Sequence, residues 1–130
     1  MYRQVVAFVL GLLVAISAAA QLAPQTRSQG GVTVAVTPTD LGSSARVWAF
    51  KIVLDTHSQD LSDDLVKSAV LLDGQGRESK PVVWEGAAPG GHHREGVLKF
   101  PAFKPLPESV ELRIARPGEA AARMFRWQLE

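Results

Sequence analysis

The sequence predicts an all-β domain built as a sandwich of antiparallel strands. Three observations predict it. Short runs in which apolar and polar residues alternate recur along the chain, and turn residues, mainly Gly and Pro, separate these runs. The chain has 130 residues, and the part after an apolar N-terminal segment is long enough for one core. Seven short strands at this spacing are typical of an immunoglobulin-like antiparallel sandwich, which we expect to follow an N-terminal signal helix.

Residues 1–20 have the three parts of a secretory signal peptide. Arg3 is the only charge, Val5 to Ala20 is almost wholly apolar, and Ala18 to Ala20 supplies the small residues of a cleavage site. The apolar stretch is shorter than the roughly 20 residues that span a bilayer. We therefore expect cleavage after Ala20 and a periplasmic or secreted domain, with retention as a membrane anchor as the alternative.

Charge and cysteine content exclude several classes of function. Removal of residues 1–20 takes away Arg3 and no acidic residue, so the 13 Asp and Glu are then matched by as many Lys and Arg. A neutral domain lacks the basic excess that nucleic-acid binding needs. The chain has no cysteine, which excludes disulfides, thiolate zinc sites and cysteine nucleophiles. No second apolar stretch is long enough to span a membrane, so we expect no membrane contact after cleavage.

The predicted organisation is a signal peptide at 1–20, a flexible lead-in at 21–31 and the sandwich at 32–130. Apolar side chains at every second position mark the strands. The expected strands cover residues 32–37, 48–55, 66–72, 81–84, 97–100, 110–114 and 125–129. The run 48–55 alternates most clearly and is predicted to be central.

The connections between these strands also have readable signals. Asp73 to Gly76 is a predicted hairpin turn that makes 66–72 and 81–84 partners, and Pro81 favours an edge position for the second strand. A short helical turn is expected at 60–65, capped by Ser62 or Asp60. The tryptophans are expected to pack in the core, while a sugar-stacking platform would need two indoles exposed on one surface. They are Trp48, Trp84 and Trp127.

The candidate functional residues are the three histidines, which all lie in predicted loops or at strand ends. Loops at one end of a sandwich come close in space, so we expect His57 to lie near His92 or His93. Imidazole is a common ligand of copper and zinc. The predicted metal site comprises His57, His92, His93 and Asp55. Further acidic residues nearby are expected to add an oxygen ligand or to orient a histidine, namely Asp60, Asp63 and Asp64.

A structural interpretation of the same residues stays open. His57 then hydrogen-bonds backbone in its loop, and His92 and His93 anchor a long loop. The sequence has no H-E-x-x-H or G-x-S-x-G motif, so we expect no enzyme; a hydrolase using Glu85 and Glu95 is a remote alternative. We expect Glu85 to form a surface ion pair with Arg94 or Arg77 instead. The spacing at 60–65 does not fit a calcium loop of the EF-hand kind.

Several runs together resemble a group of uncharacterised exported bacterial and archaeal β-sandwich proteins. The runs are LDTHS at 54–58, WEG at 84–86, PGGHHR at 89–94 and GVLKF at 96–100. The resemblance covers Gly31 to Leu129 and implies the fold and export but no activity.

The cysteine-free exported sandwich with loop histidines is also similar, more loosely, to the periplasmic copper-resistance carriers. Those carriers use an amino-terminal His and Met-rich segments. Here cleavage would leave Gln21 first, and Met1 and Met124 are the only methionines, which argues against a Cu(I) site.

These observations predict an exported, non-enzymatic β-sandwich module, a structural or protein-interaction domain of the cell envelope. An exposed edge strand or the histidine-bearing loop would dock an envelope protein partner. The alternative function is binding of Cu(II) or Zn(II) through the loop histidines. The distances among the three imidazoles separate the two hypotheses.

Overall fold

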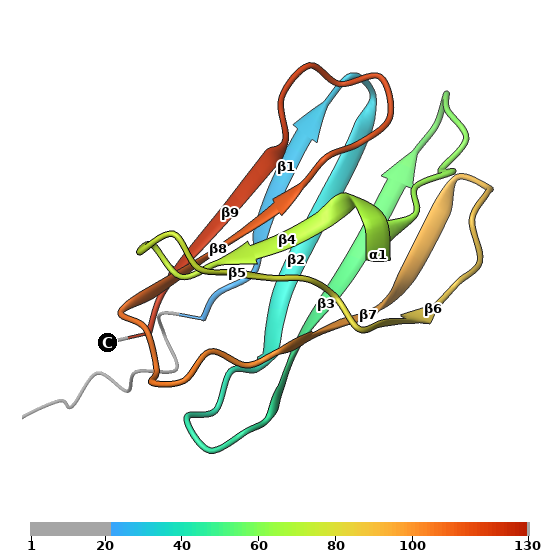
Figure 1. Cartoon of the computed structure of the whole chain (residues 1–130). Helices are drawn as coiled ribbons and strands as arrows, with labels where there is room; N and C mark the ends of the chain where they lie inside the picture. The colour runs from blue at the N-terminus through green and yellow to red at the C-terminus, as the bar shows by residue number, and fades with distance from the viewer. Residues whose placement is uncertain (1–21, 130) are drawn as a thin grey trace, which may run out of the picture.

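A computed structural model describes residues 22–129 as two antiparallel sheets packed face to face (Figure 1). The predicted signal peptide at 1–20 lies outside the described residues. Within 22–129 no helix is long and apolar enough to cross a membrane. The elements are β1 (Gln25–Gln29), β2 (Val32–Asp40), β3 (Val47–Thr56), α1 (Leu65–Ser68), β4 (Ala69–Leu72), β5 (Glu78–Ser79), β6 (Val83–Gly86), β7 (His93–Pro101), β8 (Ser109–Ile114) and β9 (Arg123–Gln128).

The prediction of an all-β fold is confirmed, with nine strands among the described residues where seven were expected. One sheet has the order β1-β2-β3-β7-β6, and the other has the order β5-β4-β8-β9. β3 occupies the middle of the larger sheet, as its strong alternation predicted. β2 and β7 flank it along its length, and its inward side chains are buried because the smaller sheet packs over them.

The core contains the inward side chains of both sheets. Trp48 and Trp127 are buried, while Trp84 is partly buried against the core near one edge. Phe50 meets Trp127 with ring centroids 5.5 Å apart and Phe100 at 5.6 Å, so aromatic contacts join β3, β7 and β9. The tryptophans therefore pack in or against the core and do not form a platform of exposed indoles. Each large side chain buried in this way contributes about 1.5–3 kcal/mol to stability.

β1 lies within residues 21–31, where a flexible lead-in was expected. Gly30 and Gly31 have φ of 58° and 80°, the positive values that a two-residue hairpin turn of the mirror-image type requires. The hairpin pairs β1 with β2 from Gln25 to Gln29. Because β1 is polar and lies at the edge of its sheet, it lacks the alternation of apolar and polar residues from which a strand is predicted.

The chain also departs from prediction between residues 60 and 86. The turn after β4 forms as expected, but β4 pairs with the two-residue strand β5, and β6 pairs with β7 in the other sheet. Pro81 lacks the N–H that a continued ladder with β4 would need, so the chain leaves that sheet there. α1 begins after Asp64, whose side chain accepts from the Lys67 N–H; the cap is therefore neither Ser62 nor Asp60.

The two sides of the sandwich differ in how their edges are closed. On the β1/β9 side, the Gln25 amide bonds both the N–H and the carbonyl of Arg126, which mimics a strand neighbour. Arg123 donates to three carbonyls of the β1–β2 hairpin, and Trp127 donates to the Ala23 carbonyl. On the β5/β6 side, β4 has a strand partner only at Leu71 and Leu72. We call this the open side.

Candidate functional site

Four connections gather at one end of the sandwich, at the upper right of Figure 1. They are the β1–β2 turn, the β3–α1 loop, the β6–β7 loop and the β8–β9 loop, at residues 30–31, 57–64, 87–92 and 115–122. We call this region the loop end. It contains His57 and His92, with His93 and Asp55 at the adjoining strand ends, so the expectation that the fold brings the histidine-bearing segments to one end is met.

The β3–α1 and β6–β7 loops are bonded directly to each other. The Gly91 N–H donates to the Asp60 carboxylate at 2.9 Å, and the Leu61 N–H donates to the Gly91 carbonyl at 3.1 Å. The Gly90 N–H donates to the Leu61 carbonyl at 2.8 Å. Gly90 and Gly91 have φ of 115° and 76°, a backbone that other residues adopt only under strain. The glycine pair therefore joins the two loops, and Asp60 is a loop anchor.

Arg94 fixes the same two loops from inside. Its side chain is buried, and its guanidinium donates to the carbonyls of Asp63 at 2.7 Å and of Leu61 and Ala87 at 3.3 Å. It also lies over the Trp84 ring, 5.6 Å from the centroid. Its Nε has no acceptor among residues 22–129. The expected surface pair of Arg94 with Glu85 is wrong, because Arg94 points inward from β7.

A chain of buried ion pairs extends from Asp63 across the loop end. Arg116 donates to both Asp63 oxygens, at 2.9 and 3.0 Å, and to Glu119 at 3.1 Å. Arg123 donates to both Glu119 oxygens at 2.8 Å. Hydrogen bonds from Arg123 hold the pKa of Glu119 below its usual value, although burial opposes them. All four side chains are at most 11% exposed, so the β3–α1 and β8–β9 loops are locked together.

His93 lies at the margin of the loop end, on the outer face of the larger sheet. It stands opposite Asp55 in the β3–β7 register, and its Nδ1 is 2.5 Å from the Asp55 carboxylate. Its Nε2 is 3.5 Å from Glu95, which pairs with Lys51 at 2.8 Å. The Asp55 hydrogen bond raises the pKa of His93. With a carboxylate at each ring nitrogen, the imidazole is suited to act as a doubly donating cation.

The structure brings two of the four predicted metal ligands into contact, Asp55 and His93. His57 and His92 are exposed on adjoining backbones, since the Thr56 N–H donates to the His92 carbonyl at 2.9 Å. Neither imidazole has a hydrogen bond within residues 22–129. Among those residues no group of three or more His, Cys, Asp or Glu is arranged to hold a metal ion. The structural interpretation expected His92 and His93 to anchor the β6–β7 loop. Gly91 and Arg94 anchor it instead.

The three further oxygen ligands considered from the sequence have structural partners. Asp60 binds the Gly91 N–H, Asp63 binds Arg116 and Asp64 caps α1. Glu85 pairs with Lys99 at 3.1 Å on the outer face of the larger sheet. The acidic residues of this region therefore hold loops and strands together.

Sequence reasoning missed the buried arginines, although alternation carried a signal for two of them. Arg94 has the same parity as the buried Leu98 in β7, and Arg123 has the same parity as the buried Phe125 in β9. If the rule that every second strand residue points inward is applied to charged residues as well, it places both arginines inside the sandwich. No known protein family, curated protein or solved structure matches this chain.

Proposed function

We propose that this chain is an exported, non-enzymatic module of the cell envelope that binds a protein partner through its loop end. The observation that carries the proposal is the buried ionic chain from Asp63 to Arg123. Burying a charge costs several kcal/mol, and apolar side chains of similar volume would hold a sandwich at least as well. The ionic chain is better explained by the conformation that it imposes on exposed loops.

A fixed loop conformation favours recognition, because a preorganised loop loses little conformational entropy when it binds. Sandwich domains commonly use loops gathered at one end for this purpose. The exposed side chains here include His57, Ser58 and His92, which offer donors, acceptors and flat imidazole rings. Their chemistry suits a neutral hydrogen-bonding surface on a protein.

Export and an immunoglobulin-like relationship belong to the same proposal. The signal pattern at residues 1–20 supports export to the periplasm or beyond. Two antiparallel sheets with loops gathered at one end support the immunoglobulin-like comparison.

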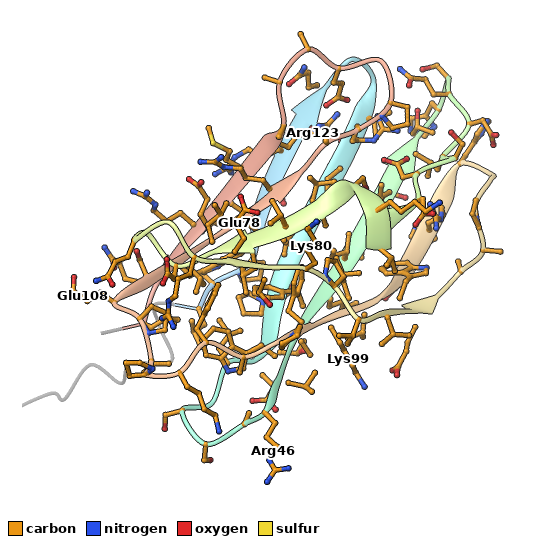
Figure 2. All side chains as sticks on the ribbon, in the orientation of Figure 1. Arg46, Glu78, Lys80, Lys99, Glu108 and Arg123 are labelled. Atoms are coloured by element: carbon orange, nitrogen blue, oxygen red, sulfur yellow. The ribbon has the colours of Figure 1, made fainter. Side chains whose placement is uncertain are left out.

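Affinity capture from the envelope fraction tests the partner hypothesis. The bait is the chain expressed with its own N-terminal segment, and its double variant His57→Ala, His92→Ala is compared with Arg46→Ala. Arg46 is exposed at the opposite end of the molecule (Figure 2). We expect one enriched protein with the wild type and with Arg46→Ala, and its loss with the double variant. Enrichment that survives in the double variant would remove the loop end from the proposal.

A second candidate function is Cu(II) or Zn(II) binding by His57, His92, His93 and Asp55. The two exposed imidazoles without hydrogen bonds favour it, together with the Asp55–His93 contact. A metal at His93 must displace a proton, so binding should weaken as the pH falls. Calorimetric titration tests this with wild type, His57→Ala and His93→Ala. Affinity weaker than about micromolar for both ions excludes the site, and unchanged affinity in both variants excludes these ligands.

A further inference from the structure

The open side of the sandwich carries a groove of about 490 Å³ between two segments of the chain. One wall is α1 with β4, and the other is β5 with the connection toward β6. Figure 2 shows Glu78 and Lys80 beside the β4 ribbon, on the second wall. The lining residues are Val66, Lys67, Ser68, Ala69, Val70, Glu78, Lys80 and Pro81.

The groove exists because β5 is too short to cover β4. Pairing with β5 is confined to Leu71 and Leu72, so Ala69 and Val70 have a strand neighbour only in β8. Pro81 then takes the chain across to the larger sheet. On this side the Ala69 N–H already donates to the Leu65 carbonyl of α1. What is left beside the groove is a short stretch of β4 without a strand neighbour, along which an extended segment can lie.

Exposed apolar side chains concentrate around this groove. The described chain has five large apolar side chains that are exposed, and three of them lie on the open side. Val66 is 36% exposed on α1 and lines the groove. Val82, which follows the lining residue Pro81, is 57% exposed, and Val83, 36% exposed at the start of β6, has the parity of Glu85 on the outer face of the larger sheet. Exposed apolar side chains beside a groove are typical of an interaction site.

The charge of the lining shows which partner is complementary. Lys67 and Lys80 face a single acidic lining residue, Glu78. Lys67 is 85% exposed and meets Asp64 only at 3.9 Å, and Lys80 forms no ion pair within the described residues. Both ammonium groups are therefore available to a carboxylate. Four of the eight lining residues are apolar, and the charged ones give the groove a net positive charge.

We propose that this groove binds an extended peptide segment in which apolar and acidic residues alternate. Successive side chains of an extended segment point to opposite sides. One set then packs on Val66 and Val70 while the acidic set reaches Lys67 and Lys80. This surface is separate from the loop end, and the partner segment belongs to another protein.

Nuclear magnetic resonance tests the groove with two defined probes. The full chain, isotope-labelled, is titrated with a capped hexapeptide of alternating Val and Glu and then with one of alternating Val and Lys. Lys80→Glu is compared with Arg46→Glu, which makes the same change of charge at an exposed site at the far end of the molecule (Figure 2). We expect shifts confined to residues 66–70 and 78–83 with the acidic peptide. Lys80→Glu should weaken its binding about threefold or more, and Arg46→Glu should not.

Several results overturn the proposal. Equal binding of the basic peptide, no binding of either peptide, or an equal effect of both charge reversals contradicts the stated chemistry. Shifts at residues 66–70 that depend on protein concentration without peptide would assign the groove to a second copy of this chain. His57 and His92 are left unchanged throughout, so failure here leaves the loop-end proposal standing, and the capture experiment can fail independently.

Discussion

Removal of the Asp63 carboxylate is the sharpest test of the buried ionic chain. Asp63 is fully buried and accepts two hydrogen bonds from Arg116, whose side chain is 4% exposed. In Asp63→Ala, Arg116 keeps only Glu119 as a carboxylate partner, and Glu119 is already shared with Arg123. Removing one member of a buried pair typically costs about 3–5 kcal/mol because a buried charge loses its partner. For a domain of this size that corresponds to a fall in the melting temperature of at least about 10 °C.

Urea denaturation followed by tryptophan fluorescence measures this loss. Glu85→Ala is the matched control, because it breaks an ion pair with Lys99 on the outer face in which the Glu85 side chain is 55% exposed and the Lys99 side chain 34%. We expect a cost of about 0.2–1 kcal/mol for that pair. A loss below about 1 kcal/mol in Asp63→Ala would refute the view that this chain of charges holds the loop end.

The apolar double variant Asp63→Leu, Arg116→Met separates stability from loop conformation. Replacing both charges removes the uncompensated arginine, so most of the lost stability should return. Hydrogen exchange at the Leu61 and Gly90 amides should nevertheless stay faster than in wild type, because the loop has lost its anchor. Restored stability together with restored protection would mean that the ionic chain has no role in fixing the loops.

Three further predictions concern single positions. Asp55→Asn should lower the pKa of His93, read by titration of its ring protons, because the hydrogen bond that raises it loses its charge. Since that pKa is raised in the folded state, the Asp55–His93 pair stabilises the fold fully below the unfolded pKa of about 6.5, and this stabilisation disappears as the pH rises through the folded pKa. A difference in unfolding free energy between wild type and Asp55→Asn that grows at alkaline pH would contradict this. Gly91→Ala has open space around a new Cβ but a φ of 76°, so we expect a loss of about 1 kcal/mol in urea titrations, whereas a neutral result would mean that the loop relaxes. Gly96→Ala should cost more, about 1–3 kcal/mol, because a Cβ there would lie 2.6 Å from the Trp84 ring; the reverse order of the two glycine variants would show that the ring moves aside.

The parts of the fold that the sequence predicted are those where burial imposes a period of two. β2, β3, β8 and β9 each have one buried face, and their alternating residues identified them. β5 was missed because a two-residue strand is too short to show any period. The helical turn was predicted at 60–65 and residues 66–68 were assigned to the following strand, so α1 begins later than expected, because the cap at Asp64 is recognisable only once the helix is known.

The candidate site could be predicted only in part, for a different reason. The loops that carry His57 and His92 meet at one end, as a sandwich requires. Which side chains touch depends on register, however, and the Asp55–His93 contact follows from their pairing across β3 and β7. Arg94 was placed on the surface because long charged residues are usually exposed. Its buried position depends on carbonyl acceptors from loops distant in sequence.

The residues that made the two loops recognisable in the sequence mostly have structural roles. The Thr56 hydroxyl accepts from two loop N–H groups and donates to the Gly31 carbonyl. The Asp60 carboxylate accepts from the Gly91 N–H, and Arg94 donates to carbonyls of both loops from the interior. Once these roles are assigned, the side chains of His57, Ser58 and His92 remain exposed and without a hydrogen bond within residues 22–129. Exposed residues without partners cost less than about 0.5 kcal/mol to replace. A His57→Ala variant that keeps full stability but loses its partner or metal would assign that residue to function, whereas a destabilised variant would assign it to the fold.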